Sequence, residues 1–406
     1  MKPAIDPEHV SLRPAEVVMK LARMGSFHQT RLSFMRVLLR RLKQARWTFQ
    51  RSRLQMDEQG VGTAIYEAKG PEGVFSLVAF AHDLPAEKRS DRVIADRWDA
   101  TFALYDGIPG EEDIRRMARN VPLQEAGSCS QTELVLARAN RSVRLFDHVV
   151  ERLSLGEQPD PDAIRRTGYL MRTTAVYGNG KFGLGDRARI SERGLFSGPF
   201  QAEMLAVWLI RWFTCDIAEH LARMCSPSRA VPLDRSIRAR LGVGNSTGLG
   251  MAPFLGTHPA LVHSWIHARE SALARVRSLS GADADSRERF ARMLLRARAA
   301  VNSWHTDNPR QADRVRDLVG DLVRLDGHLK TGALQHSEPW DRLYRWGEAS
   351  LTLEGQEMLV SLIIEPHGAL VDDLAGSLSV VELPYTAVDG SWRIGDTLSR
   401  LHHCYH

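Results

Sequence analysis

The spacing of hydrophobic residues predicts helices along most of the chain. Apolar side chains recur every three or four positions in the first sixty residues and again after residue 110, which is the period of an amphipathic helix. The helices predicted on this basis cover residues 14–24, 29–50, 111–120, 132–153, 161–170, 199–224, 259–279, 286–303, 309–329, 351–364 and 366–374. The helix over 199–224 contains MLAVWLIRWF and is expected to be buried on most sides.

Alternation of apolar and polar residues predicts strands in a shorter part of the chain. Residues 61–67 and 74–82 flank the turn KGPEG and predict a hairpin, with an added antiparallel strand over 92–104. Another strand is expected at 377–383. The predicted fold class is α+β, predominantly α-helical, with a small antiparallel β-meander at 61–106 and a C-terminal mixed segment. Helix and strand do not alternate regularly, so a doubly wound parallel sheet is not expected.

The length of 406 residues is enough for more than one domain. The linker GEQPDPD suggests a division near residue 158. Residues 1–158 would then hold the N-terminal helices, the β-meander and the helices after it. Residues 159–406 would form a mainly helical core domain that carries two glycine-rich loops.

Composition and charge exclude several classes of protein. With 43% hydrophobic and 25% charged residues the chain is an ordinary globular protein, and its net charge of +5 is spread among many acids, which disfavours nucleic acid as a partner. The four cysteines form no CxxC motif, so a cytoplasmic protein without a disulfide framework is expected. The excess of arginine over lysine is typical of a GC-rich, bacterial-type genome. Neither a secretory signal nor a membrane span is predicted.

The first glycine-rich loop is RTTAVYGNGKFGLGD, residues 172–186. It satisfies G-x-G-x-x-G, but the segment after it is charged and rich in turn residues, so a dinucleotide fold is not expected. Its amides, hydroxyls and cations suit an oxyanion instead. The alternative is a surface turn in which the glycines only supply positive φ. The predicted residues are Lys181 as a catalytic group, with Arg172, Thr173, Tyr177, Gly178, Asn179 and Gly180 binding the substrate.

The second candidate segment is residues 241–268, which contain no Asp, Glu, Lys or Arg. In a chain that is one-quarter charged, such a run predicts an irregular segment that is buried or lines a cavity. The polar groups of a buried loop must be satisfied, so Asn245, Ser246 and Thr247 either serve the backbone or face a ligand.

A carboxylate and an imidazole lie close together in the sequence at Glu365 and His367. At the edge of a hydrophobic core their pKa values could be shifted towards general acid or base work. The alternative is that Pro366 only begins a helix. Two further groups have ligand-type atoms, the i, i+4 pair His263 and His267, and the terminal cluster His402, His403 and His406. We nevertheless predict no metal and no other cofactor.

The favoured function is an enzyme that acts on a small anionic metabolite, carboxylate- or phosphate-bearing, by proton-transfer, elimination or acyl-type chemistry. It would be a lyase, an isomerase or a transferase. The alternative is a non-catalytic binding or scaffold protein that uses arginine-rich helices against an acidic partner or nucleic acid. Convergence of Arg172, Lys181, Asn245 and Glu365 on one pocket would favour the enzyme. The apolar helix predicted over 199–224 is also compatible with a homodimer in which it forms the interface.

Overall fold

The computed structural model describes residues 12–13, 15–18, 28, 31–89, 97–121, 130–178, 192–198, 200–245, 259–304 and 309–377. The chain divides into two compact units. Leu38–Ser246 form the first, called here the sheet unit. Met1–Val37 and Thr247–His406 form the second, called the helical unit. The boundary predicted after residue 158 lies inside the sheet unit.

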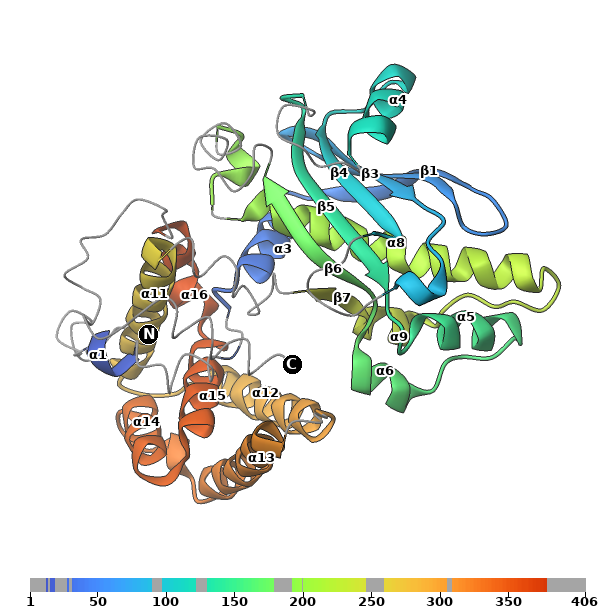
Figure 1. Ribbon diagram of the computed structural model, residues 1–406. Helices are drawn as coiled ribbons and strands as arrows, with labels where there is room; N and C mark the ends of the chain where they lie inside the picture. Colours follow the sequence, from blue (N-terminus) through green and yellow to red (C-terminus); the bar gives the residue numbers. More distant parts are fainter. Residues whose placement is uncertain are drawn as a thin grey trace. The chain divides into compact units, whose positions relative to one another are not determined.

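A single seven-stranded sheet organises the sheet unit, with its strands side by side in chain order (Figure 1). The strands are β1 (Thr48–Met56), β2 (Gly62–Gly70), β3 (Gly73–Ala81), β4 (Ala100–Asp106), β5 (Glu133–Arg141), β6 (Tyr169–Gly178) and β7 (Gly242–Asn245). Neighbouring strands are antiparallel except for β6 and β7, which are parallel. The predicted fold class, with only a small antiparallel meander at 61–106, is therefore wrong: the sheet is mixed, curled and much larger.

Two of the missed strands, β1 and β5, fall within predicted helices, whereas β6 and β7 fall within the predicted glycine-rich segments. The predicted helix over 132–153 is in fact strand β5 followed by α5 (Phe146–Ser154). Most residues of β5 are buried, so its sequence ELVLARANR lacks the alternation that marks a half-buried strand. The predicted helix over 29–50 is α3 (Phe34–Gln44), which is followed by Arg46 at φ 55° and then by β1.

Local signals set the start of β6. Helix α6 (Pro161–Thr167) begins after Asp160, whose side chain accepts hydrogen bonds from the backbone N–H groups of Asp162 and Ala163. It ends at Gly168, which adopts φ 74° and allows the chain to leave the helix. The first half of the predicted loop over 172–186 is consequently part of a strand.

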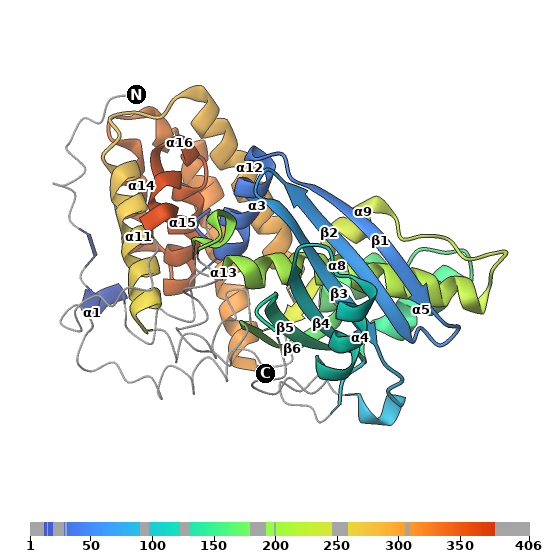
Figure 2. The same ribbon diagram turned by 90° about the horizontal axis from the view of Figure 1, so that it is seen from above.

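One face of the sheet is covered by α8 (Gln201–Cys225), which runs across the strands in Figures 1 and 2. Its Phe213 meets Phe102 of β4 edge to face, with ring centroids 5.3 Å apart. The hydroxyl of Tyr66 on β2 donates a hydrogen bond of 2.8 Å to Asp216. Most residues of α8 are buried, which confirms the expectation drawn from its apolar composition.

The other face of the sheet carries α4 (Glu111–Asn120). Ile114 and Met117 of this helix are buried in one cluster with Ile65, Val78 and Phe80 of the sheet. The remaining short elements of the unit are η2 (Ala86–Lys88), η3 (Gly194–Phe196) and α9 (Arg235–Arg240).

The helical unit packs its helices around Phe290, Trp340 and the apolar residues of its longer helices. In Figure 2 the helices α11, α14 and α15 lie side by side. The elements are α1 (Ala15–Val18), α11 (Pro259–Arg277), α12 (Ala284–Asn302), α13 (Pro309–Lys330), η4 (Ala333–Gln335), α14 (Pro339–Ser350), α15 (Leu353–Ile364), α16 (Gly368–Val371) and η5 (Asp372–Ser377). In the part of the chain that the structure describes, every helix is too short or too polar to span a lipid bilayer.

A cluster of four buried charges lies in the helical unit. Arg13 donates hydrogen bonds of 2.8 Å to Glu270 on α11 and 2.6 Å to Glu357 on α15. Arg269 lies 2.8 Å from the other oxygen of Glu357, and all four side chains are at most 7% exposed. Two cations and two carboxylates balance each other, as burial requires. The cluster ties the segment around Arg13 to both helices.

Candidate functional site

The two glycine-rich segments predicted to hold a ligand leave neighbouring strands that run in the same direction. Thr173 of β6 is the register partner of Asn245 of β7, and Arg172 is the partner of Gly244. The chain leaves β7 at Asn245 and leaves β6 at Gly178, five residues beyond Thr173 and so roughly 16–17 Å further along at the rise of an extended strand. Both segments therefore follow the carboxyl end of a parallel strand.

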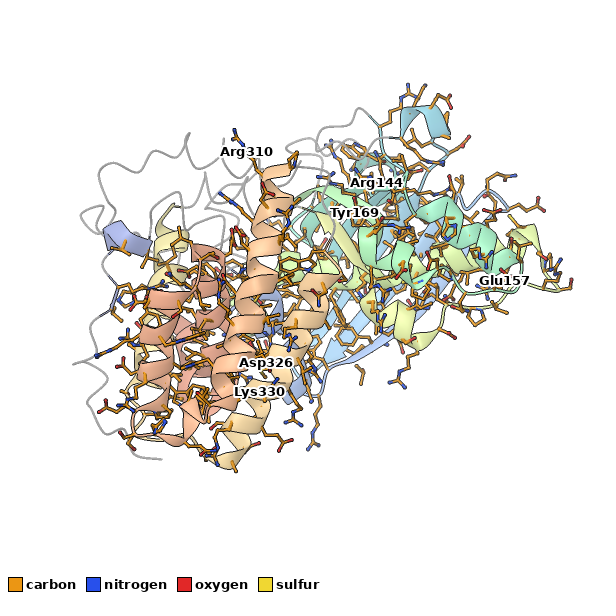
Figure 3. The ribbon with its side chains drawn as sticks, turned by 90° about the horizontal axis from the view of Figure 1, so that it is seen from below. Arg144, Glu157, Tyr169, Arg310, Asp326 and Lys330 are labelled. Atoms are coloured by element: carbon orange, nitrogen blue, oxygen red, sulfur yellow. The ribbon has the colours of Figure 1, made fainter. Side chains whose placement is uncertain are left out.

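The close approach of β6 and β7 depends on a glycine. A Cβ atom on Gly244 would lie 2.6 Å from the ring of Tyr169, so any larger residue would displace that ring. Tyr169 is the first residue of β6 and is labelled in Figure 3. A hydrogen bond of 2.8 Å from the N–H of Gly242 to the carbonyl of Gly168 fixes the start of both strands.

The predicted binding residues fall into different environments. Thr173 is 2% exposed, and its hydroxyl makes no hydrogen bond with the described residues, while Arg172 is half-buried. Tyr177, Gly178 and Asn245 lie on the strands. Asn179, Gly180, Lys181, Ser246 and Thr247 lie outside the described residues.

Glu365 and His367 lie in the helical unit and have separate partners. Glu365 is 9% exposed and pairs with Arg36, whose Nη1 donates a hydrogen bond of 2.7 Å. The Nδ1 of His367 lies 2.8 Å from the carbonyl of Ile363, which must accept, so Nε2 of the neutral ring carries the lone pair. Burial lowers the pKa of His367, and nearby Arg289 lowers it further. The two predicted catalytic groups are not joined by a hydrogen bond.

Of the histidines considered as metal ligands, only the side chain of His267 lies in the described part of the structure. His267 is exposed on α11 and its Nδ1 lies 3.5 Å from the hydroxyl of Ser271. His263 lies on the same helix, whereas His402, His403 and His406 are outside the described residues. Among the described residues, no three histidine, cysteine or acidic side chains cluster closely enough to hold a metal ion.

The sheet brings other charged residues to the end at which β6 finishes. Val135 is the partner of Gly178, and Tyr105 is the partner of Glu133, so β4 ends and β5 begins beside the end of β6. Glu133 is buried there and accepts hydrogen bonds of 2.6 Å from Arg116 and 2.7 Å from the N–H of Ser130. These bonds hold the guanidinium of Arg116 against the sheet.

A hollow of about 700 Å³ lies over α4 at this end of the sheet. Its described lining residues are Glu112, Asp113, Arg115, Arg116, Ala118 and Arg119. The hydrogen bond that Arg116 donates to Glu133 raises the pKa of Arg116, so this side chain is charged at neutral pH. Its Nη1 is buried and has no hydrogen-bond partner among the described residues. A buried guanidinium N–H without an acceptor is costly, which makes this group a candidate to bind an anion.

Sequence reasoning missed the residues of this hollow. The only signal was the run RRMAR on α4, which lies in the helix predicted over 111–120 and was not considered as a site. Glu133 was placed inside a predicted helix, and nothing local links it to Arg116. Only the pairing of β5 with β4 and β6 brings the two residues together.

Carboxylates lie among the arginines of the described helices of the helical unit and pair with several of them. Arg298 of α12 donates a hydrogen bond of 2.9 Å to Asp326 of α13, which also accepts from Lys330 one turn later (Figure 3). Arg277 pairs in the same way with Asp341 at 2.9 Å. Interleaved carboxylates of this kind weaken the scaffold alternative, because nucleic-acid binders concentrate positive charge on one face.

Comparison with protein-family models, with curated proteins and with solved structures finds no match to this chain.

Proposed function

We propose that the sheet unit binds a small anionic metabolite, carboxylate- or phosphate-bearing, at the carboxyl ends of β6 and β7. The observation that carries this proposal is the parallel pairing of the two strands, with Thr173 opposite Asn245. In open sheets of parallel strands, ligands bind in the crevice outside the carboxyl ends of the strands, and β6 and β7 form one parallel pair of this kind. Here both of those segments are glycine-rich, and one is free of charged residues.

A second observation supports the proposal: Arg116 and the hollow over α4 lie at the end of the sheet at which β6 finishes. Its guanidinium is held by Glu133 and keeps one buried N–H group without an acceptor among the described residues. An anion in the hollow over α4 would supply that acceptor, and charge-assisted bonds of this type are shorter and stronger than neutral ones. Lys181, three residues beyond Gly178, adds a further cation by its position in the sequence.

The chemistry proposed for the site is proton transfer, elimination or acyl transfer on the bound anion. Lys181 is the candidate catalytic group, because an amine next to bound anions and glycine backbone can hold charge or move a proton. Glu365 and His367 take no part in this proposal, because Glu365 is paired with Arg36 and Nδ1 of His367 is engaged by the backbone. The two side chains named for binding and catalysis, Arg116 and Lys181, both belong to the sheet unit.

Thermal-shift and calorimetric titrations with phosphate, pyrophosphate, malate and citrate test the proposal, with sodium chloride at equal ionic strength as a control. A specific ligand raises Tm with its concentration because it binds only the folded chain. Loss of one charge-assisted hydrogen bond weakens binding about tenfold or more. We expect that loss in Lys181→Gln and in Arg116→Gln.

Lys88→Gln and Arg235→Gln are the matched controls, since both side chains are exposed in the same unit. They should bind like the wild type. Arg116→Gln also removes the cation that pairs with the buried carboxylate of Glu133, which destabilises the fold. If this variant unfolds, Lys181→Gln still tests the proposal. The proposal fails if none of the four anions raises Tm beyond the chloride control, or if Lys181→Gln binds as tightly as Lys88→Gln.

A further inference from the structure

A second group of cations lies at the opposite end of the sheet, where β5 finishes and β6 begins. Arg141 is the last residue of β5 and is only 8% exposed. Its guanidinium lies over the ring of Phe146 on α5, with Cζ 4.9 Å from the ring centroid. Its Nε is buried and has no hydrogen-bond partner among the described residues. A guanidinium has five N–H donors, so this burial is expensive unless an acceptor is supplied.

The nearest carboxylate, Asp99, does not supply that acceptor. Its Oδ1 lies 3.7 Å from Nε of Arg141, too far for a hydrogen bond, and already accepts from Nε of Arg89 at 2.8 Å. Its Oδ2 accepts from the backbone N–H of Arg141 at 2.8 Å. Asp99 is itself 1% exposed and is held in place because its N–H donates to Asn140. Two guanidiniums thus share one carboxylate whose oxygens are both occupied.

Arg141 is closely packed by the turn that contains Gly60. Gly60, at φ 77° in the turn between β1 and β2, packs so closely that a Cβ there would lie 3.3 Å from Nη2 of Arg141 and 3.0 Å from Leu221. Two exposed carboxylates, Asp83 and Asp147, act on Arg141 from further away. Burial outweighs all three nearby carboxylates, so the pKa of Arg141 is lowered. The cation is therefore incompletely compensated by the chain itself.

We propose that Arg141 and Arg89 form a second ligand site, separate from the one at the carboxyl end of β6, which takes a small, singly charged carboxylate. The planar guanidinium forks fit a carboxylate in bidentate fashion. Close packing around Gly60 excludes bulky ligands. Asp83 and Asp147 repel multiply charged anions, which distinguishes this site from one for pyrophosphate or citrate.

Calorimetric titration of the full chain with acetate tests this site, with chloride at equal ionic strength and pyrophosphate as comparisons. Acetate should bind saturably, and Arg89→Gln and Arg141→Gln should each weaken it about tenfold or more, as expected for one lost charge-assisted bond. Arg235→Gln should bind acetate like the wild type, because this exposed side chain belongs to neither site. Arg89→Gln carries the test if Arg141→Gln does not fold, because Arg89 is the less buried of the two.

Three results would overturn the inference. These are the absence of heat beyond that of chloride, unchanged acetate binding in both arginine variants, and competition by pyrophosphate for the same site with higher affinity. Loss of acetate binding in Lys181→Gln alone would assign the anion to the carboxyl end of β6 and reject a second site.

Discussion

Arg51 and Arg53 lie two residues apart on β1 and yet reach opposite faces of the sheet. In a regular strand they would point the same way, but Arg51 pairs with Tyr66 and Arg53 with Ile65, so Ser52 forms a bulge between them. Nη1 of Arg51 lies 2.9 Å from Asp216 on α8, and Arg53 pairs with Glu111 on α4. Ion pairs therefore connect the edge strand β1 to α8 on one face of the sheet and to α4 on the other. The bulge and the charged side chains also disfavour pairing of β1 with a strand of another molecule.

The two ion pairs should contribute very differently to stability. Asp216 is 5% exposed and also accepts from Tyr66 and pairs with Arg238, so Asp216→Ala leaves buried donors unsatisfied. We expect it to lower the free energy of unfolding by about 1–3 kcal/mol. Arg53→Ala should change it little, because the pair with Glu111 is exposed to solvent. Urea unfolding of both variants measures the difference, and equal losses would contradict this assignment.

Gly244→Ala tests the contact that sets β7 against β6. The new methyl group would lie 2.6 Å from the ring of Tyr169, so the ring or the strand must shift. Overpacking of this kind costs about 1–3 kcal/mol, and the anion affinity proposed for the carboxyl ends of the two strands should fall with it. Gly281→Ala is the control, since nothing lies within 4 Å of its added Cβ. The contact is unimportant if the two variants unfold at the same urea concentration.

The chain should lose stability on mild acidification because of two partly buried histidines. Burial lowers the pKa of His367 below its ordinary value of 6.5, and His82 is shifted in the same direction by the same cause. Between the lowered pKa and 6.5 the unfolded chain binds more protons than the folded chain, so stability is complete above 6.5 and falls as the pH drops.

The variant His367→Asn cannot titrate and should show a flatter dependence of the unfolding free energy on pH between 7.5 and 5. The difference in slope is at most about 1.4 kcal/mol per pH unit, the limit for a single proton. His82 still titrates in this variant, so some slope should remain. Identical slopes for the variant and the wild type would show that His367 is protonated equally easily in the folded and unfolded chains.

Cys215 and Cys225 lie on the same helix and should differ in reactivity. Burial raises the pKa of the Cys215 thiol to about 11, while Cys225 is exposed. At pH 8 only about a thousandth of Cys215 would be the nucleophilic thiolate. Iodoacetamide followed by peptide mass spectrometry should therefore find Cys225 modified and Cys215 intact in the folded chain, with both modified in urea. Modification of Cys215 without denaturant would mean that α8 does not stay packed on the sheet.

Much of the helical structure follows from local pattern. The predicted helices over 111–120 and 309–329 correspond closely to α4 and α13, because an amphipathic stripe and its end signals lie within a few turns of chain. The strand β5 could not be recognised in this way. A strand buried on both faces has no period of two, and its sequence ELVLARANR is equally compatible with a buried helix until its neighbours are known.

The same distinction between local pattern and tertiary contact applies to the candidate sites. The sequence by itself singled out a glycine-rich segment and an uncharged segment, because unusual composition is visible without any contact. Only the tertiary structure decided that Thr173 lies opposite Asn245, that Arg116 meets Glu133, and that Arg141 shares Asp99 with Arg89. Each of these relations joins residues from different strands or loops. Which strands pair with one another depends on the free energy of the whole sheet. No local pattern of side chains specifies the partner of a strand.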